Sequence, residues 1–173
     1  MSSAIVTLAE LDEMDFARLG RISCGDDGMK VRYQLERREE YVKASHCVYL
    51  WTIPQPALTD ELRVMYVGST GNNIYHRRST WQSGLNAGHR KRLKAKLEGL
   101  AEPEIVGRGA WMRRNILSAS SAEGEISVWV RISEFKRVFD QIVPIAKVEE
   151  DALIQKFSQE WNWHGQNKAF SPA

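Results

Sequence analysis

Two predicted helices of this sequence each carry a charged side chain on the face that should be buried. In the helix that begins at Ile74, Arg77 and Trp81 share a face with Ile74, because positions three and seven residues apart lie on one side of a helix. Near the other end of the chain, Glu150 has the same relation to Leu153. A charge on such a face costs several kcal/mol to desolvate unless a partner compensates it. Both side chains therefore need partners, and the partners decide the chemistry.

Two kinds of partner satisfy this requirement. Arg77 and Glu150 can neutralise each other in a buried salt bridge with a purely structural role. Alternatively, the two charges and nearby tyrosines converge on a phosphodiester, with the carboxylate holding a divalent metal ion that assists hydrolysis. The helical periodicity leaves both interpretations open.

The tyrosines lie on two predicted strands. Residues 47–53 and 63–68 are rich in β-branched and aromatic residues, and the first run ends at a proline. We expect an antiparallel hairpin joined by residues 54–62. Pairing the strand ends next to this loop places Tyr49 opposite Tyr66, so that two phenols project side by side from one face. Taken alone, two such tyrosines are simply core aromatics.

The segments after the hairpin provide the remaining core elements. Asn72 or Asn73 is expected to cap the following helix. Residues 125–133 are the clearest strand, because apolar and polar residues alternate along them. We expect a short helix around residues 135–142 and a last helix at about 145–158.

Two further segments look like additions to this core. Residues 1–45 predict a helical arm, in which Thr7 and Glu10 form a capping-box pattern. Residues 31–44 are expected to be a second, highly charged helix, although their start is equally consistent with a strand. Residues 101–124 contain few core residues and predict an irregular insertion.

The net charge of +2 is distributed unevenly. It is −4 over residues 1–62, +8 over 63–114 and −2 over 115–173. A predicted helix at 89–100 places its leucines inward and its basic side chains outward, which suits either a solvated surface or the neutralisation of phosphates. The candidate DNA-binding residues are Arg78, His76, His89, Arg90, Lys91, Lys94, Arg113 and Arg114.

Composition excludes several classes of protein. The chain has 173 residues, 43% hydrophobic and 27% charged, as expected for one globular domain. Its apolar runs are far shorter than the roughly 20 residues of a membrane-spanning helix, and its start lacks a signal-peptide pattern. Cys24 and Cys47 are isolated, which argues against a zinc site or a disulfide framework. We therefore expect a cytoplasmic protein without a membrane partner.

Four blocks of the sequence, taken in order, resemble the GIY-YIG nucleases. The first two family motifs correspond to Cys-Val-Tyr at 47–49 and Tyr-Val-Gly at 66–68. The apolar-x-x-Arg helix start corresponds to residues 74–77. The final Glu-x-x-Leu-Ile run, which closes on an asparagine, corresponds to residues 150–162. Each block alone is only weakly specific for the family. The occurrence of all four blocks in the family's order is more specific.

The sequence departs from the family pattern at several positions. Cys47 replaces the first glycine, and Gln159 stands where a proline is common. One residue is inserted before the helix, so that His76 occupies the ungapped position of the arginine. We assign Arg77 because the helix start then keeps its apolar residue, with Arg78 as the alternative.

The resemblance implies an α/β (α+β) fold with a small, mixed, mostly antiparallel three-stranded sheet flanked by helices. Residues 1–45 would be an N-terminal helical extension and residues 46–165 the nuclease domain, with an insertion at 101–124 and a tail at 166–173. It also implies hydrolysis of DNA with one Mg²⁺ or Mn²⁺ ion.

Roles for five residues follow from the resemblance. Glu150 would be the metal ligand, and Arg77 would hold the scissile phosphate and stabilise the charge of the transition state. Tyr49 would accept a proton from the attacking water, although a phenol is a weak base at neutral pH. Tyr66 would hydrogen-bond the phosphate or the water, and Asn162 would orient Glu150.

The sequence therefore predicts a stand-alone endonuclease. A restriction, defence or mobile-element enzyme is favoured over a repair subunit, because the chain has no room for additional repair domains and shows no zinc finger or helix-turn-helix. A palindromic target would favour a homodimer. The alternatives are a nucleic-acid-binding protein that keeps the fold without cleavage, and an α/β domain with a structural ion pair.

Overall fold

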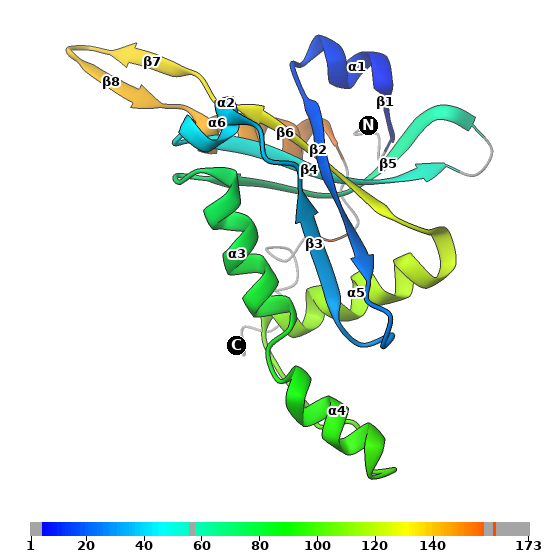
Figure 1. Ribbon diagram of the computed structural model, residues 1–173. Helices are drawn as coiled ribbons and strands as arrows, with labels where there is room; N and C mark the ends of the chain where they lie inside the picture. The colour runs from blue at the N-terminus through cyan, green and yellow to red at the C-terminus, as the bar shows by residue number, and fades with distance from the viewer. Residues whose placement is uncertain (1–4, 56–57, 158–160, 162–173) are drawn as a thin grey trace, which may run out of the picture.

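The computed structural model describes residues 5–55, 58–157 and 161 (Figure 1). The main sheet has six strands, and a two-stranded hairpin lies outside it. The sheet strands are β1 (Ile5–Thr7), β2 (Ala17–Cys24), β3 (Val31–Leu35), β4 (Cys47–Gln55), β5 (Leu58–Thr70) and β6 (Ile126–Ile132). The hairpin strands are β7 (Phe135–Val138) and β8 (Gln141–Pro144). The helices are α1 (Leu8–Glu13), α2 (Glu39–Lys43), α3 (Ile74–Leu85), α4 (His89–Leu97), α5 (Arg108–Glu123) and α6 (Ala146–Lys156).

The main sheet has the order β1-β5-β4-β6-β2-β3, and every pairing in it is antiparallel. The fold is therefore α+β, as expected, but the sheet has six strands instead of three. Helices cover both faces, with α3 and α5 on one side and α1 and α6 packed in the second core (Figure 1).

Strand β4 lies at the centre of the molecule. Its residues from Cys47 to Ile53 are all buried, because both faces of the sheet are covered. Tyr49 and Trp51 point into the core beneath α3, whereas Val48 and Leu50 point into the core beneath α6. The period of two along one strand therefore divides its side chains between the two cores.

The N-terminal 45 residues do not form the expected helical arm. They contribute three strands of the main sheet and only two short helices, α1 and α2. The alternation of apolar and polar residues in β3 is typical of a strand, since Val31 and Tyr33 are buried while Arg32 and Gln34 are exposed. The strand alternative for the start of residues 31–44 is thus confirmed, and pairing with the sheet overrides the helical tendency of charged residues. The capping box of Thr7 and Glu10 is confirmed at the start of α1.

Two other predicted segments are also corrected. Residues 108–123 form helix α5 instead of an irregular insertion, and Met112 and Ile116 are buried one turn apart in the core. Residues 135–142 belong to the β7–β8 hairpin instead of a short helix, and Phe139 in its turn has a φ of 54°. The helical expectation is wrong there because the hairpin side chains are mostly exposed, which weakens the apolar alternation.

The remaining core elements are confirmed. Strands β4 and β6 and helices α3 and α6 form where they were expected, whereas β5 begins at Leu58, within the expected loop at 54–62. Asn73 caps α3, since its side chain accepts a hydrogen bond from the backbone N–H of His76 at 2.9 Å. Within the described residues, none of the helices is both long and apolar enough to cross a bilayer.

Cys47 provides a pH-dependent test of this core. Burial raises the pKa of its thiol from 9.0 to about 11, despite an opposing hydrogen bond with the backbone of Ile74. The unfolded chain loses this proton near pH 9 and the folded chain does not, so stability falls as the pH rises from 9 to 11. At pH 10 the loss is about 1.4 kcal/mol, the equivalent of one pKa unit.

We therefore expect urea unfolding at pH 8 and pH 10 to give a larger loss of stability for the wild type than for Cys47→Ala. Cys24→Ala is the matched control and should keep the wild-type loss, because Cys24 is only partly buried. Equal pH dependence in wild type and Cys47→Ala would contradict the burial argument.

Candidate active site at the C-terminal end of strand β5

The structure brings the two predicted tyrosines together, but in a different register from the expected one. Tyr49 lies opposite Gly68, and Tyr66 lies opposite Trp51, with a bulge between Trp51 and Thr52. The direct pairing of the two tyrosines is therefore wrong, and they are diagonal neighbours on one face. Their ring centroids are 6.1 Å apart, and both rings are buried. The bulge and a longer β5 shift the register.

Gly68 leaves the space that the ring of Tyr49 fills. A Cβ atom at Gly68 would lie 2.5 Å from Cζ of Tyr49 and 2.6 Å from its hydroxyl oxygen. No real side chain tolerates such a contact, so glycine is required here by close packing. This contact gives a physical reason for the glycine of the Tyr-Val-Gly block.

Arg77 is bound to one of these tyrosines. Its Nε donates a hydrogen bond to Oη of Tyr49 at 3.1 Å, and Nε1 of Trp81 donates to the same oxygen at 3.0 Å. The phenol oxygen then accepts two N–H groups, which leaves only its own O–H to donate to a bound molecule. Burial lowers the pKa of Arg77, but its interactions with Tyr49, Tyr66 and Tyr33 together outweigh burial, and the net shift of the pKa is upward. Arg77 therefore stays charged.

Arg108 is a second arginine in the site, and no pattern in the sequence indicated it. Its Nη2 donates a short hydrogen bond to Oη of Tyr66. Its guanidinium carbon lies 4.9 Å from the centre of the Trp81 ring. The first residue of α5 thus reaches the tyrosine pair from a segment that was expected to be irregular. Arg108 reaches Tyr66 only because α5 packs there in the fold, so local sequence patterns do not indicate this contact.

The groups around Tyr66 shift the pKa of its hydroxyl. Burial raises the pKa of its hydroxyl well above the usual value of 10.0, and Tyr49 adds to the increase. Arg108 and Arg77 oppose it, whereas Glu150 raises it further. The Tyr66 hydroxyl is therefore protonated at neutral pH and can donate a hydrogen bond.

Glu150 approaches from the other side of the sheet. It lies on α6 and is 7% exposed, which confirms its place on the inward face. Its Oε2 accepts hydrogen bonds from Oγ of Ser69 at 2.6 Å and from Nζ of Lys147 at 2.9 Å. Burial lowers the pKa of Lys147, but its hydrogen bonds to Glu150 and Asp151 outweigh burial and the net shift is upward.

The salt bridge between Arg77 and Glu150 is not formed. Arg77 binds Tyr49, and no ion pair joins it to Glu150 among the residues that the structure describes. The reason is that the two residues lie in the two different cores, on opposite faces of the sheet. Helical periodicity predicted that the helix faces carrying Arg77 and Glu150 both point inward. It does not show which of the two cores each helix face packs against.

The two halves of the site meet at the C-terminal end of β5. Strand β1 pairs with β5 only at residues 61–63, so this pairing does not extend to residues 66–70. Along this stretch Tyr66 and Gly68 belong to the α3 side, while Ser69 contacts Glu150 on the α6 side. The effect of Glu150 on the pKa of Tyr66 shows that the two sides interact electrostatically.

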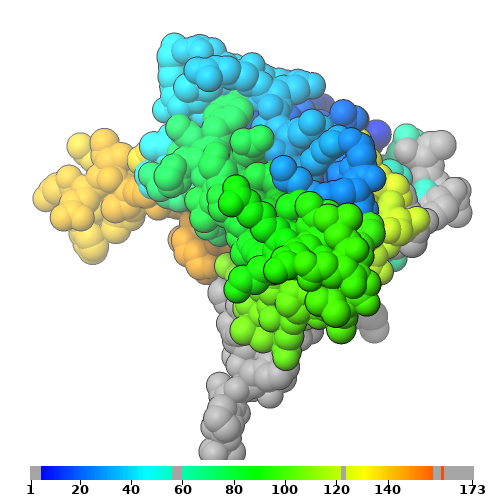
Figure 2. All heavy atoms as spheres, turned by 60° about the horizontal axis from the view of Figure 1, so that its bottom comes forward, coloured from blue at the N-terminus to red at the C-terminus, as the bar shows by residue number. Residues whose placement is uncertain are grey.

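The predicted DNA-binding residues fall into two groups. His76, Arg90, Lys91, Lys94 and Arg114 are exposed, and α4 lies on the surface (Figure 2). The other three have protein partners. Nε of Arg78 donates to the carbonyl of Tyr33 at 2.8 Å, and His89 lies 3.4 Å from a carboxylate oxygen of Asp27.

Arg113 is buried, which contradicts its prediction as a DNA-binding residue. Its Nε and Nη2 both donate to the carbonyl oxygen of Met29, at 3.0 and 2.8 Å, and its Nη1 lies 3.4 Å from Glu102. The guanidinium therefore holds the loop after β2 against α5. The neighbouring Arg114 is exposed. Two adjacent arginines in a sequence do not show which of them points inward.

Helix α4 is oriented differently from the expectation. Arg92 is 2% exposed and donates to the carbonyl of Ala87 at 2.6 Å, whereas Leu97 and Leu100 are 79% and 62% exposed. The helix ends at Leu97, and a turn at Gly99 takes the chain away. The leucines therefore do not define the inward face, although Arg90, Lys91 and Lys94 still point outward.

The predicted metal site depends on one carboxylate. No group of three or more potential ligands from His, Cys, Asp and Glu occurs within the described ranges. Glu150 Oε2 accepts both hydrogen bonds, and no described residue donates to Oε1. Asn162, the other predicted polar residue, lies outside the described residues. Trp161 beside it donates its backbone N–H to the carbonyl of Met65 at 2.8 Å.

The fold has counterparts among solved structures. A mutant of bacteriophage T4 EndoII matches with a TM-score of 0.54 over 88% of this chain and 95% of that one, at 16% sequence identity. Restriction endonuclease HPY188I in complex with product DNA matches with a TM-score of 0.42 over 86% and 77%, at 11% identity. No protein-family model and no curated protein sequence matches the chain. The match with T4 EndoII shows a shared fold, and the second match is too weak to support a conclusion.

The packing of Tyr49 on Gly68 predicts a large effect of a small substitution. Gly68→Ala should lower the free energy of unfolding by about 1–3 kcal/mol, because the new methyl group overlaps the phenol ring. Gly84→Ala is the matched control, since a Cβ atom there meets open space within α3 and should stabilise the helix by up to about 1 kcal/mol. Chemical denaturation of both variants measures the difference. Equal stabilities would show that the ring moves aside without cost.

Proposed function

We propose that this protein is a metal-dependent DNA endonuclease. The observation that carries the proposal is the cluster of Tyr49, Tyr66 and Arg77 on one side of β5, with Glu150 hydrogen-bonded to Ser69 near the C-terminal end of the same strand. These are the residues that the GIY-YIG resemblance had selected from separate parts of the sequence. The fold shared with T4 EndoII supports the same class of activity.

Arg77 is suited to hold the scissile phosphate. Its present acceptor is the neutral oxygen of Tyr49, whereas a phosphate oxygen carries negative charge and can accept a bidentate pair of hydrogen bonds from a guanidinium. A bound phosphodiester would therefore draw the guanidinium away from the phenol. At this position Arg77 would also stabilise the additional negative charge that develops in the transition state.

The same movement would free Tyr49 to act on the attacking water. While Arg77 and Trp81 both donate to its oxygen, the phenol has no lone pair left for a further donor. Departure of Arg77 would open one position on this oxygen to accept a hydrogen bond from the attacking water. Transfer of the water proton to Tyr49 would require the phenol to release its own O–H proton. Tyr66, protonated at neutral pH, would donate a hydrogen bond to the phosphate.

Glu150 fits the role of ligand to one Mg²⁺ or Mn²⁺ ion. A single carboxylate suits an ion that keeps several of its waters, and Oε1 has no donor among the described side chains. When bound, such an ion would polarise the phosphate and lower the pKa of an attacking water. Ser69 orients the carboxylate, and Lys147, which is 64% exposed, is free to turn toward solvent. Asn162 remains the proposed residue that orients Glu150.

The exposed basic side chains of α4 would bind the DNA backbone. Arg90, Lys91 and Lys94 point to solvent, and Lys94 is partly neutralised by Glu98 at 3.8 Å. Each phosphate contact releases counterions and makes the affinity depend on salt. His76 and Arg114 are exposed as well and are proposed to contribute contacts nearer the tyrosines.

The biological setting belongs to the same proposal. A site-specific restriction, defence or mobile-element nuclease is favoured, acting on a palindromic site as a homodimer in the cytoplasm. The second candidate is a nucleic-acid-binding protein that keeps this fold without cleavage. The position of Lys147 on the Glu150 carboxylate favours that candidate, because the lysine occupies part of the space that a metal ion would need.

Cleavage assays separate the two candidates. We expect purified protein to cut unmethylated plasmid or genomic DNA with Mg²⁺ or Mn²⁺ and not with EDTA. Glu150→Gln should reduce the rate by about 100-fold or more, since it removes the charge of the proposed ligand, and Tyr49→Phe should reduce it as well. Rates are measured under single-turnover conditions.

Asp151→Asn is the matched control for Glu150→Gln. It removes a neighbouring carboxylate on α6 that is 56% exposed, and it should leave the rate close to that of the wild type. DNA binding in EDTA together with no cleavage under any metal condition would support the non-catalytic candidate. Equal cleavage by wild type and Glu150→Gln would reject the proposed site.

A further inference from the structure

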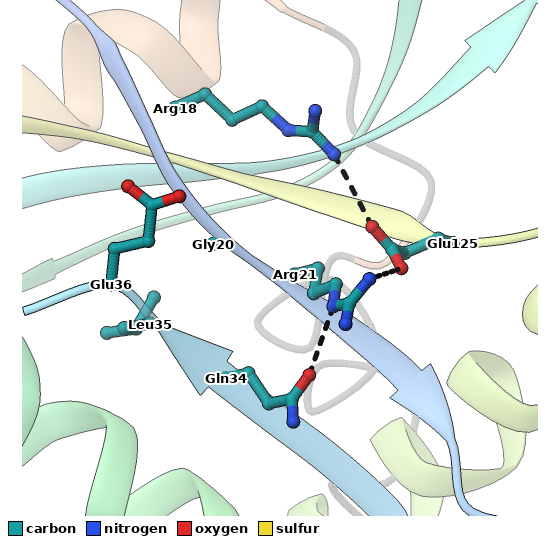
Figure 3. A pocket seen from close by; sticks show the side chains of 7 residues that line it. All are labelled: Arg18, Gly20, Arg21, Gln34, Leu35, Glu36 and Glu125. Carbon is teal, nitrogen blue, oxygen red and sulfur yellow. Dashed lines mark hydrogen bonds and ion pairs between the residues drawn. The ribbon is translucent and has the colours of Figure 1, made fainter.

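Several arginines of this protein have carboxylate partners. Arg18 and Arg21 both face Glu125 across a surface pocket, at 3.4 and 2.9 Å (Figure 3). Arg131 lies 2.7 Å from Glu149. Each of these arginines therefore has a carboxylate within ion-pair distance, and Arg18 and Arg21 share theirs.

Arg77 and Arg108 differ from these arginines. Each has a tyrosine hydroxyl as its hydrogen-bond acceptor, and neither has a carboxylate within ion-pair distance in the described part of the chain. Nε of Arg108 is also buried without a hydrogen-bond partner there, a state that it shares with Nε of the carboxylate-paired Arg131. The acceptor that distinguishes Arg108 is therefore the phenol in place of a carboxylate.

The two guanidinium groups contact the same aromatic side chain. Their carbons are 5.5 and 4.9 Å from the centre of the Trp81 ring, and their acceptors, Tyr49 and Tyr66, are adjacent. Both are positive charges held by neutral phenols, which do not neutralise them. A polyanion with neighbouring phosphates would compensate both at once, through charge-assisted and bidentate hydrogen bonds.

We propose that Arg108 is a second phosphate-binding residue of the site. On binding, its guanidinium leaves the hydroxyl of Tyr66 and holds a phosphate of the DNA strand next to the phosphate at Arg77. The inference rests on the proposed function and extends it to α5, which then provides part of the substrate-binding surface. The departure of Arg108 also releases the Tyr66 hydroxyl for the phosphate.

DNA binding in EDTA tests this role without requiring cleavage. Affinity for a short duplex is measured at several salt concentrations for wild type, Arg108→Met and Arg108→Lys. Methionine has a similar length and retains apolar packing on Trp81, whereas lysine retains the charge. We expect Arg108→Met to make the slope of log K against log salt shallower by about 0.9, the change that corresponds to one fewer neutralised phosphate. Arg108→Lys should keep the wild-type slope.

Arg21→Met is the matched control, because it removes an arginine that is paired with Glu125. It should leave the slope unchanged. If Arg108 serves only to pack on Trp81 and Tyr66, Arg108→Met will lower the melting temperature and keep the wild-type slope, and the inference is then wrong. A changed slope in a protein that cleaves no DNA would support Arg108 and reject the nuclease function, so the two failures are distinguishable.

Discussion

The hydroxyl of Tyr49 is the point on which the candidate site depends. It accepts hydrogen bonds from Arg77 and Trp81 of α3, while the ring packs on Gly68 of β5. A single side chain of β4 thus fixes the position of a neighbouring strand and of a helix. Because the ring is fully buried, the arrangement tolerates neither a larger residue at Gly68 nor the loss of the hydroxyl, which would leave two buried N–H groups without an acceptor.

The electrostatic consequence is a set of positive charges held by neutral acceptors. Several other arginines are neutralised by carboxylates, as Arg131 is by Glu149. Arg77 and Arg108 instead bind phenols, which hold them in place and leave most of their charge available. Glu150 is kept apart from them on the other face of the sheet, so it does not neutralise them. The carboxylate has its own partners there, Ser69 and Lys147.

The fold shows why local patterns predict some segments correctly and others wrongly. Strands β4 and β6 were predicted from their own residues. The first is rich in β-branched and aromatic residues and runs to a proline, and the second alternates apolar and polar residues. Strand β2 was missed and β3 was left open between helix and strand, because charged residues such as Arg32 lie on the exposed face and pairing within the sheet decides the structure. The register of β4 and β5 was missed because a bulge after Trp51 does not appear in any sequence pattern.

The sequence alone determined which side chains face inward, because helical and strand periodicity depend only on spacing: Arg77, Glu150 and the two tyrosines are all buried or partly buried as expected. The tertiary structure alone decided which of them meet. Arg77 and Glu150 lie in different cores, Arg108 joins the tyrosines from a distant helix, and Arg113 leaves the candidate surface to bind Met29. Periodicity fixes the direction of a side chain relative to its own element, but only the packing of elements against one another fixes its neighbours.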